Sequence, residues 1–152
     1  MSSKFCILPF LHMEIQTQGG VYVCCHTNSP EELGNLHENS LTEIWEGQKL
    51  QEFKKAFLEE EVVTNSHCQD CFYYEKLGAT SWREMENDNW SHYLEHAKNQ
   101  RIEKPKSVSL RFSNRCNYSC RTCKPSVSTG WFNDAKFLNP NGDYRLVEVL
   151  QR

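Results

Sequence analysis

Apolar and polar positions near the start of the chain alternate well enough to predict a strand. Residues 10–16 (FLHMEIQ) alternate, residues 21–25 (VYVCC) follow, and Gly19 and Gly20 stand between the two runs. Short alternating runs separated by glycines are typical of a β-hairpin. This hairpin would bring Cys6 and the adjacent pair Cys24 and Cys25 to the same end, away from the turn.

Helical periodicity follows in two stretches. Each begins with a capping-box signature, at Ser40 with Glu43 and at Ser81 with Glu84. We expect helices over about 40–60 and 81–99. The expected buried positions are Leu41, Ile44, Trp45, Phe53, Ala56 and Phe57 in the first helix, and Trp82, Met85, Trp90, Tyr93, Leu94 and Ala97 in the second. Residues 64–71 are expected to form a loop that ends in Cys68-x-x-Cys71.

The last third of the chain starts after a break at Lys104-Pro105. Residues 107–112 (SVSLRF) alternate and predict a strand, on which Val108, Leu110 and Phe112 would share one face. A helix is expected over about 126–136. The predicted fold class is therefore α+β, with a small hairpin and helices first and a strand with a following helix later.

The composition and charge of the chain argue against nucleic acid and membranes as its binding partners. The 152 residues are 38% hydrophobic and carry a formal net charge of −3, with Lys and Arg scattered along the chain. A nucleic-acid surface normally shows clustered basic residues. No apolar run approaches the roughly 20 residues that span a bilayer, and the N-terminus has no export signal. We expect a cytoplasmic protein that binds neither nucleic acid nor membrane.

Eight cysteines then need an explanation, because disulfides are disfavoured in a reducing compartment. Cys116, Cys120 and Cys123 lie within eight residues, directly after the predicted strand. A structural zinc site takes four ligands, whereas a 4Fe–4S cluster held by three thiolates keeps one iron open to a small molecule. The sequence therefore favours an iron–sulfur cluster with an open iron on this loop.

The spacing Cys116-x3-Cys120-x2-Cys123 after a strand resembles the cluster motif of radical S-adenosylmethionine (SAM) enzymes. This resemblance implies the first βα unit of a partial (β/α) barrel. It also implies a 4Fe–4S cluster whose open iron binds SAM, and reductive cleavage to a 5′-deoxyadenosyl radical that takes hydrogen from an unknown substrate, for which a peptide is one candidate. A reductant such as flavodoxin or ferredoxin would supply the electron. The residue before the last cysteine is often aromatic in that family, and here it is Thr122.

The cysteines before residue 75 stand in an order that resembles a second domain found in radical SAM enzymes. The order Cys6, Gly19-x4-Cys24, the stretch LGNLHENSLTEIW and Cys68-x-x-Cys71 is similar to the twitch domain, the shortened form of the SPASM domain. The resemblance implies an auxiliary iron–sulfur cluster held by Cys6, Cys24, Cys68 and Cys71. Neighbours on a strand point to opposite faces, so one residue of the pair 24–25 should reach it, and the resemblance favours Cys24. Four thiolates also suit a zinc ribbon.

The two resemblances together divide the chain into residues 1–100, an auxiliary-cluster domain with its following helix, and residues 105–152, the start of a barrel. A complete (β/α) barrel takes about 250 residues, whereas 29 residues follow Cys123. We therefore expect a fragment of a full enzyme or one half of a split protein. The alternative is a non-catalytic module that binds zinc or an iron–sulfur cluster.

Overall fold

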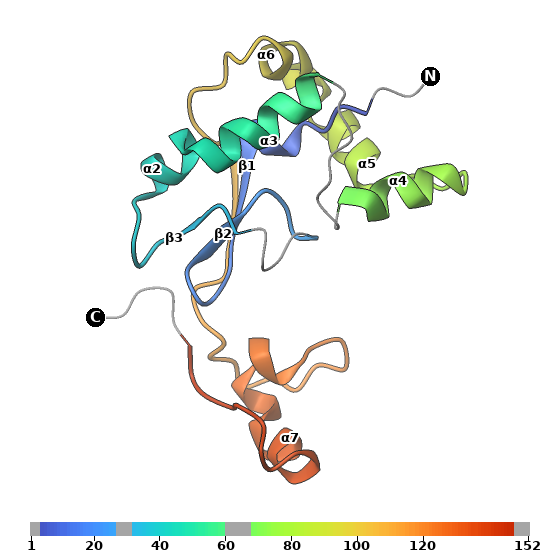
Figure 1. The fold of residues 1–152 in the computed structure, drawn as a ribbon. Coiled ribbons are helices and arrows are strands. Elements are labelled where there is room, and N and C mark those ends of the chain that lie inside the picture. Colours follow the sequence, from blue (N-terminus) through green and yellow to red (C-terminus); the bar gives the residue numbers. More distant parts are fainter. Residues whose placement is uncertain (1–3, 27–31, 60–67, 148–152) are drawn as a thin grey trace.

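The computed structural model describes residues 4–26, 32–59 and 68–147. They form a mixed α+β fold around a four-stranded sheet with the strand order β3-β2-β1-β4 (Figure 1). Strand β1 (His12–Ile15) pairs antiparallel with β2 (Gly20–Tyr22), and β2 pairs antiparallel with β3 (Gly34–Asn35). Strand β4 (Ser107–Leu110) lies parallel to β1 at the edge of the sheet. The α+β expectation is confirmed at this level.

The predicted hairpin is present, and its turn depends on a glycine. Gly19 has φ +83°, and its N–H donates to the Gln16 carbonyl at 2.9 Å. A left-handed backbone is cheap only without a Cβ. The strands are shorter than expected, because the short helix α1 (Leu8–Leu11) takes up the start of the first run. Pro9 stands in the first turn of α1, where a missing N–H costs nothing.

The core lies between the sheet and the helices that follow it. Met13, Ile15 and Val21 of the sheet are buried together with Ile44 and Trp45. The single helix expected over 40–60 is divided into α2 (Leu41–Glu46) and α3 (Gln48–Leu58). The residue between them, Gly47, is extended with ψ 151° and ends the first helix. The end expected near residue 60 lies outside the described residues.

The second helical stretch is also interrupted. Helix α5 (Trp82–Asn89) is followed by a 3-10 turn, η1 (Ser91–Tyr93), and by α6 (Leu94–Lys98). Both predicted capping boxes form. The expected burial of Trp82 and Met85 is wrong, since these side chains are 38% and 46% exposed, whereas Arg83 is 4% exposed. Arg83 points inward, where the Glu75 carboxylate and the Phe5 carbonyl accept hydrogen bonds from its guanidinium group.

Cys68 and Cys71 lie on a helix and not on the expected loop. Helix α4 (Cys68–Lys76) begins at the first of these cysteines. The remainder of that expected loop, 64–67, lies outside the described residues. A Cys-x-x-Cys motif in the first turn of a helix directs both thiols to one face, because residues three apart are neighbours on a helix surface.

Strand β4 leads into the last part of the chain, which extends away from the sheet (Figure 1). This part contains the 3-10 turns η2 (Pro125–Val127) and η3 (Thr129–Trp131) and the helix α7 (Phe132–Leu138), where one helix over 126–136 was expected. In the described residues β1 and β4 are the one parallel pair, so the barrel portion is not shown. Strand β4 ends at Leu110, two residues before the expected end; Val108 and Leu110 on one of its faces, and Phe112 beyond it, are all exposed.

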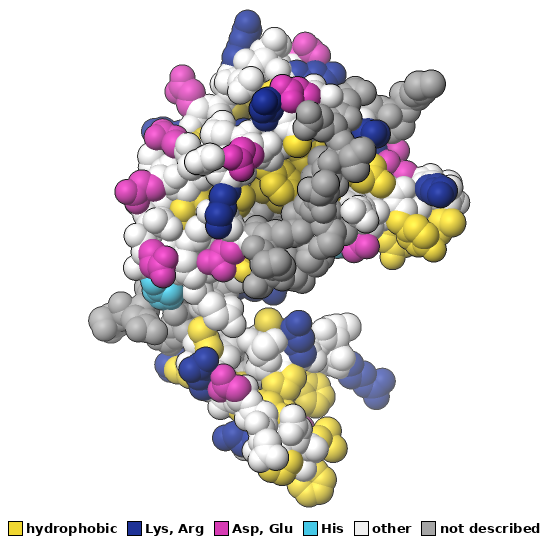
Figure 2. Space-filling model, in the orientation of Figure 1, with side chains coloured by type: hydrophobic (Ala, Val, Ile, Leu, Met, Phe, Trp, Pro, Cys, Tyr) yellow, Lys and Arg dark blue, Asp and Glu magenta, His cyan; other side chains and the backbone are white. Residues whose placement is uncertain are grey.

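Apolar side chains also gather on the surface around α7, where Phe137 and Leu138 are 86% and 81% exposed (Figure 2). None of the helices in the described residues has the length and apolar character needed to cross a membrane.

Candidate metal centre

Four cysteines from three separate segments line one cavity. Cys6 precedes α1, Cys24 follows β2, and Cys68 and Cys71 lie in the first turn of α4. Cys25 is exposed and does not line this cavity. The remaining lining residues are Leu8, His26, Phe57, Phe72, Trp82 and Arg83. The fold thus brings together the four cysteines that the sequence analysis selected and turns the fifth away.

The local backbone accounts for this arrangement. Cys24 and Cys25 lie beyond the end of β2, in the bend and turn that follow the buried Val23, where Cys24 lines the cavity and Cys25 is exposed. The N-terminal segment is anchored by core residues on both sides of Cys6, since Phe5 and Ile7 are 5% and 0% exposed. Cys6 therefore reaches the cavity from a backbone that is held by packing on both sides.

Burial controls the protonation of the thiols. It raises the pKa of Cys6 to about 12; a backbone hydrogen bond at Leu8 opposes this, and the neighbouring Cys24 and Cys71 add to it. Burial also raises the pKa of Cys71. Without a cation these thiols stay protonated at neutral pH, and a metal that binds them must displace their protons.

The donor set can be tested against a single ion and against a cluster. In residues 4–26, 32–59 and 68–147, no three His, Cys, Asp or Glu side chains converge closely enough to hold one metal ion. Thiolates that share one zinc lie about 2.3 Å from it, whereas the thiolates of a 4Fe–4S cluster each bind a different iron and stand further apart. The four cysteines that line this apolar cavity supply the thiolate donors that an iron–sulfur cluster takes.

The cavity is small. Its free volume is about 30 Å³, enough for about one water-sized group. A four-iron cluster is larger and would displace lining groups. Trp82, which is 38% exposed, and the exposed His26, with ring centroids 6.0 Å apart, are the lining groups that such a cluster would have to push toward solvent.

The three cysteines of the later loop are arranged differently. Thr129 holds the backbone of Cys116 from both sides, because its hydroxyl accepts from the N–H at 3.1 Å and donates to the carbonyl at 2.8 Å. The Trp131 indole N–H donates to the Cys120 carbonyl at 3.2 Å. Cys120 is exposed, while Cys116 and Cys123 are partly buried. The structure holds the loop but does not bring these three thiols together around a single ion position.

Sequence reasoning missed the groups that complete the first cavity. Phe57 had been expected in the core, but nothing indicated that its ring would also face the cysteines. Arg83 carries no signal at all, because a buried arginine and a solvated one look the same in a sequence.

Comparisons with known proteins agree with the geometry of the first cavity. Residues 6–72 match the family model SPASM, described as an iron-sulfur cluster-binding domain. No curated protein and no solved structure matches the chain. The matched segment begins at Cys6 and takes in all four cysteines of the cavity, which supports an iron–sulfur cofactor there. Residues 6–72 are thus similar to SPASM iron–sulfur cluster-binding domains, the wider group to which the twitch resemblance pointed.

Proposed function

We propose that this chain is the cluster-binding part of a radical SAM protein with two iron–sulfur centres. Cys6, Cys24, Cys68 and Cys71 hold an auxiliary cluster. Cys116, Cys120 and Cys123 hold a 4Fe–4S cluster with one open iron. The observation that carries the proposal is the meeting of four cysteines, from three distant segments, at one apolar cavity within the segment that matches a SPASM domain.

The first centre is suited to electron transfer or to structural support. Its four thiolates leave no coordination position for substrate. The apolar side chains of Leu8, Phe57 and Phe72 surround the sulfur atoms and limit the access of water. A buried cluster exchanges electrons without exchanging ligands.

The second centre is suited to binding a small molecule. Three cysteines on one loop leave one iron without a protein ligand. When bound to that iron, SAM supplies a 5′-deoxyadenosyl radical that removes a hydrogen atom from substrate. The chain's own contribution is to hold the loop, and Thr129, Trp131 and the Asn114 carbonyl, which accepts from the Thr129 N–H at 2.9 Å, hold its backbone. A peptide is the substrate class we propose, and a flavodoxin or ferredoxin is the proposed reductant.

Anaerobic reconstitution followed by iron and acid-labile sulfide analysis tests this assignment. We expect about eight irons per chain in the wild type. About four should remain when Cys116, Cys120 and Cys123 are replaced together by alanine, and about four when Cys6, Cys24, Cys68 and Cys71 are replaced together. Cys25→Ala is the matched control, because it removes a neighbouring thiol that does not line the cavity, and it should keep the wild-type content.

A second measurement identifies the open iron. Addition of SAM should change the electron paramagnetic resonance signal of the reduced wild type, and should leave the triple Cys116, Cys120 and Cys123 variant unchanged. Zinc without acid-labile sulfide in the wild type would contradict the proposal and favour a non-catalytic zinc module. The division of the chain near Pro105 into an auxiliary-cluster domain and a barrel segment belongs to the same proposal.

A further inference from the structure

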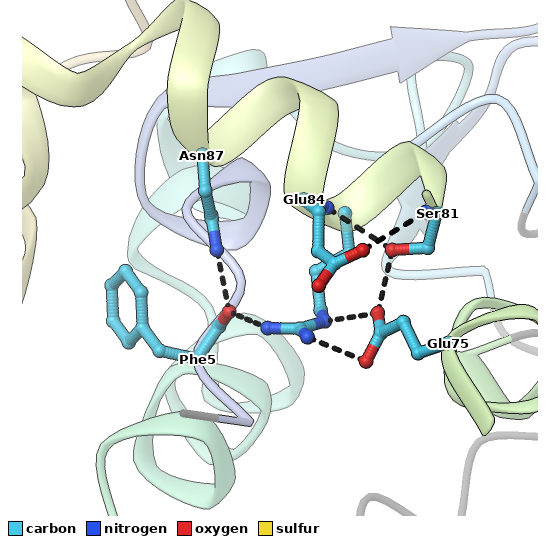
Figure 3. A network of polar contacts seen from close by, with 6 residues as sticks. Phe5, Glu75, Ser81, Glu84 and Asn87 are labelled. Carbon is cyan, nitrogen blue, oxygen red and sulfur yellow. Dashed lines mark hydrogen bonds and ion pairs between the residues drawn. The ribbon is translucent and has the colours of Figure 1, made fainter. Parts of the chain in front are cut away.

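Helix α5 holds the backbone on both sides of Cys6. The Asn87 side chain accepts from the Ile7 N–H at 2.8 Å and donates to the Phe5 carbonyl at 2.8 Å. The same carbonyl accepts a second hydrogen bond from Nη1 of Arg83 at 2.6 Å (Figure 3). Arg83 and Asn87 are four residues apart and share one face of the helix. Two side chains of one helix therefore fix the peptide groups that flank a cysteine of the cavity.

The same arginine binds the helix that carries the other two thiols. Nε of Arg83 donates to Oε1 of Glu75 at 2.9 Å, and Nη2 donates to Oε2 at 2.6 Å, which makes a bidentate ion pair (Figure 3). Glu75 lies one turn after Cys71 on α4. The Ser81 hydroxyl donates to the same carboxylate. These hydrogen bonds hold the pKa of Glu75 below its ordinary value against the effect of burial, so the pair stays ionised.

The pair is enclosed rather than solvated. The Arg83 side chain is 4% exposed and that of Glu75 is 15% exposed. The guanidinium lies over the Phe72 ring, 5.3 Å from its centroid. A bidentate arginine pair of this kind fixes both distance and orientation. Through Arg83, the segment of Cys6 and the helix of Cys68 and Cys71 are joined into one unit.

Arg83 also acts directly on the pKa of the Cys71 thiol. Its backbone N–H, in the first turn of α5, hydrogen-bonds to the Cys71 sulfur and opposes the rise in the pKa of that thiol caused by burial. The charges of Glu75 and Arg83 act on Cys71 in opposite directions. The ion pair therefore contributes little net charge while both partners are present.

We propose that Arg83 and Asn87 are positioning residues of the four-cysteine centre, and that the Arg83–Glu75 pair keeps its surroundings electrically balanced. The inference rests on the function proposed above. It extends the centre beyond the SPASM match, which ends at residue 72, to helix α5. Hydrogen bonds and charges around cluster sulfurs set reduction potentials, and loss of residues that orient metal ligands typically lowers metal affinity roughly 10- to 100-fold.

The test uses the reconstituted full chain with Cys116, Cys120 and Cys123 replaced by alanine, so that one cluster is observed. The variants are Arg83→Gln, Glu75→Gln and the two combined, with the exposed Arg101→Gln as a control for loss of one positive charge. Both single variants should release iron to a chelator roughly 10- to 100-fold faster than the parent. The control should release it at the parent rate.

The reduction potential of the reconstituted cluster distinguishes the proposed role of the Arg83–Glu75 pair from a general loss of structure, because the two single variants should shift the potential in opposite directions. Arg83→Gln leaves the Glu75 charge uncompensated and should lower the potential, while Glu75→Gln leaves the arginine uncompensated and should raise it. The double variant should return toward the parent potential while still releasing iron quickly. Arg83→Lys keeps the charge without the planar fork, so it should restore the potential but not the rate.

Asn87→Ala serves if the arginine variants do not fold. It leaves the ion pair intact and should speed iron release with an unchanged potential. Equal release rates and potentials in the parent and in all these variants would overturn this inference alone, and so would potential shifts of the same sign in both single variants. A parent protein that takes up no iron and sulfide would overturn the proposed function and, with it, this inference.

Discussion

Phe57 on α3 allows a direct measurement of how far the apolar wall of the cavity supports the fold. The side chain is 2% exposed, its ring centroid lies 5.8 Å from that of Phe53, and it lines the cavity of the four cysteines. Replacement by alanine removes the ring from both the core and the wall. The same substitution at Phe137, which is 86% exposed on α7, is a matched control.

The magnitude follows from the area buried. A buried phenylalanine removes roughly 150–250 Å² from water, and at about 25 cal/mol per Å² this is worth roughly 4–6 kcal/mol. Measured costs of buried Phe→Ala changes are about 3–5 kcal/mol. We expect Phe57→Ala to destabilise the metal-free protein by this second amount. Phe137→Ala should change stability by no more than about 0.5 kcal/mol.

Urea denaturation of the metal-free protein under anaerobic, reducing conditions measures the effect. With a slope of about 2 kcal/mol per M, the midpoint should fall by roughly 1.5–2.5 M for Phe57→Ala and stay in place for Phe137→Ala. After reconstitution, the cluster of Phe57→Ala should also bleach faster in air, because water and oxygen gain access. A loss below about 1 kcal/mol at Phe57, or an equal loss at both positions, would refute the burial argument.

Three further predictions concern a cap, a turn and a buried charge. Ser81→Ala removes a buried helix cap that also donates to a carboxylate and should cost about 2 kcal/mol in urea denaturation. Ser40→Ala, at the exposed capping box, should cost less, and an equal cost would count against the burial effect. Gly19→Ala places a Cβ 2.6 Å from Oδ1 of Asn35, at a residue with φ +83°. A left-handed backbone alone costs about 1–2 kcal/mol for a residue with a Cβ, so the clash should make the loss of stability larger than that. Gly78→Ala has φ +78° but open space, so its loss should be the backbone cost alone, and a larger loss there than at Gly19 would refute the steric reasoning. Burial lowers the pKa of Lys54 from 10.5 to about 8, so between pH 8 and 10.5 the unfolded chain holds more protons than the folded one. The stability of the wild type relative to Lys54→Met should therefore rise with pH across that window, and a flat or falling difference would contradict the burial of this charge.

Local features of the structure could be predicted because their causes lie within a few residues. A tight turn needs Gly19 for its positive φ, and a capping box needs Ser40 and Glu43 three residues apart. Such rules do not depend on what the rest of the chain does.

Helix continuity was harder to predict. The hydrophobic pattern continues through Gly47, yet the helix stops there and starts again. The sequence pattern of residues 64–71 predicted a loop that ends in Cys68-x-x-Cys71, and it did not indicate that a helix begins at Cys68.

The sequence by itself determined the α+β class, the hairpin, both helix caps and the cysteines available for metal binding. Only the tertiary structure decided that Arg83 and Asn87 face inward, that Phe57 and Trp82 wall the cavity, and that β4 pairs with β1. The reason is physical. A buried arginine is stable only where Glu75 and the Phe5 carbonyl are already in place to receive it, and those partners are eight and 78 positions away along the chain.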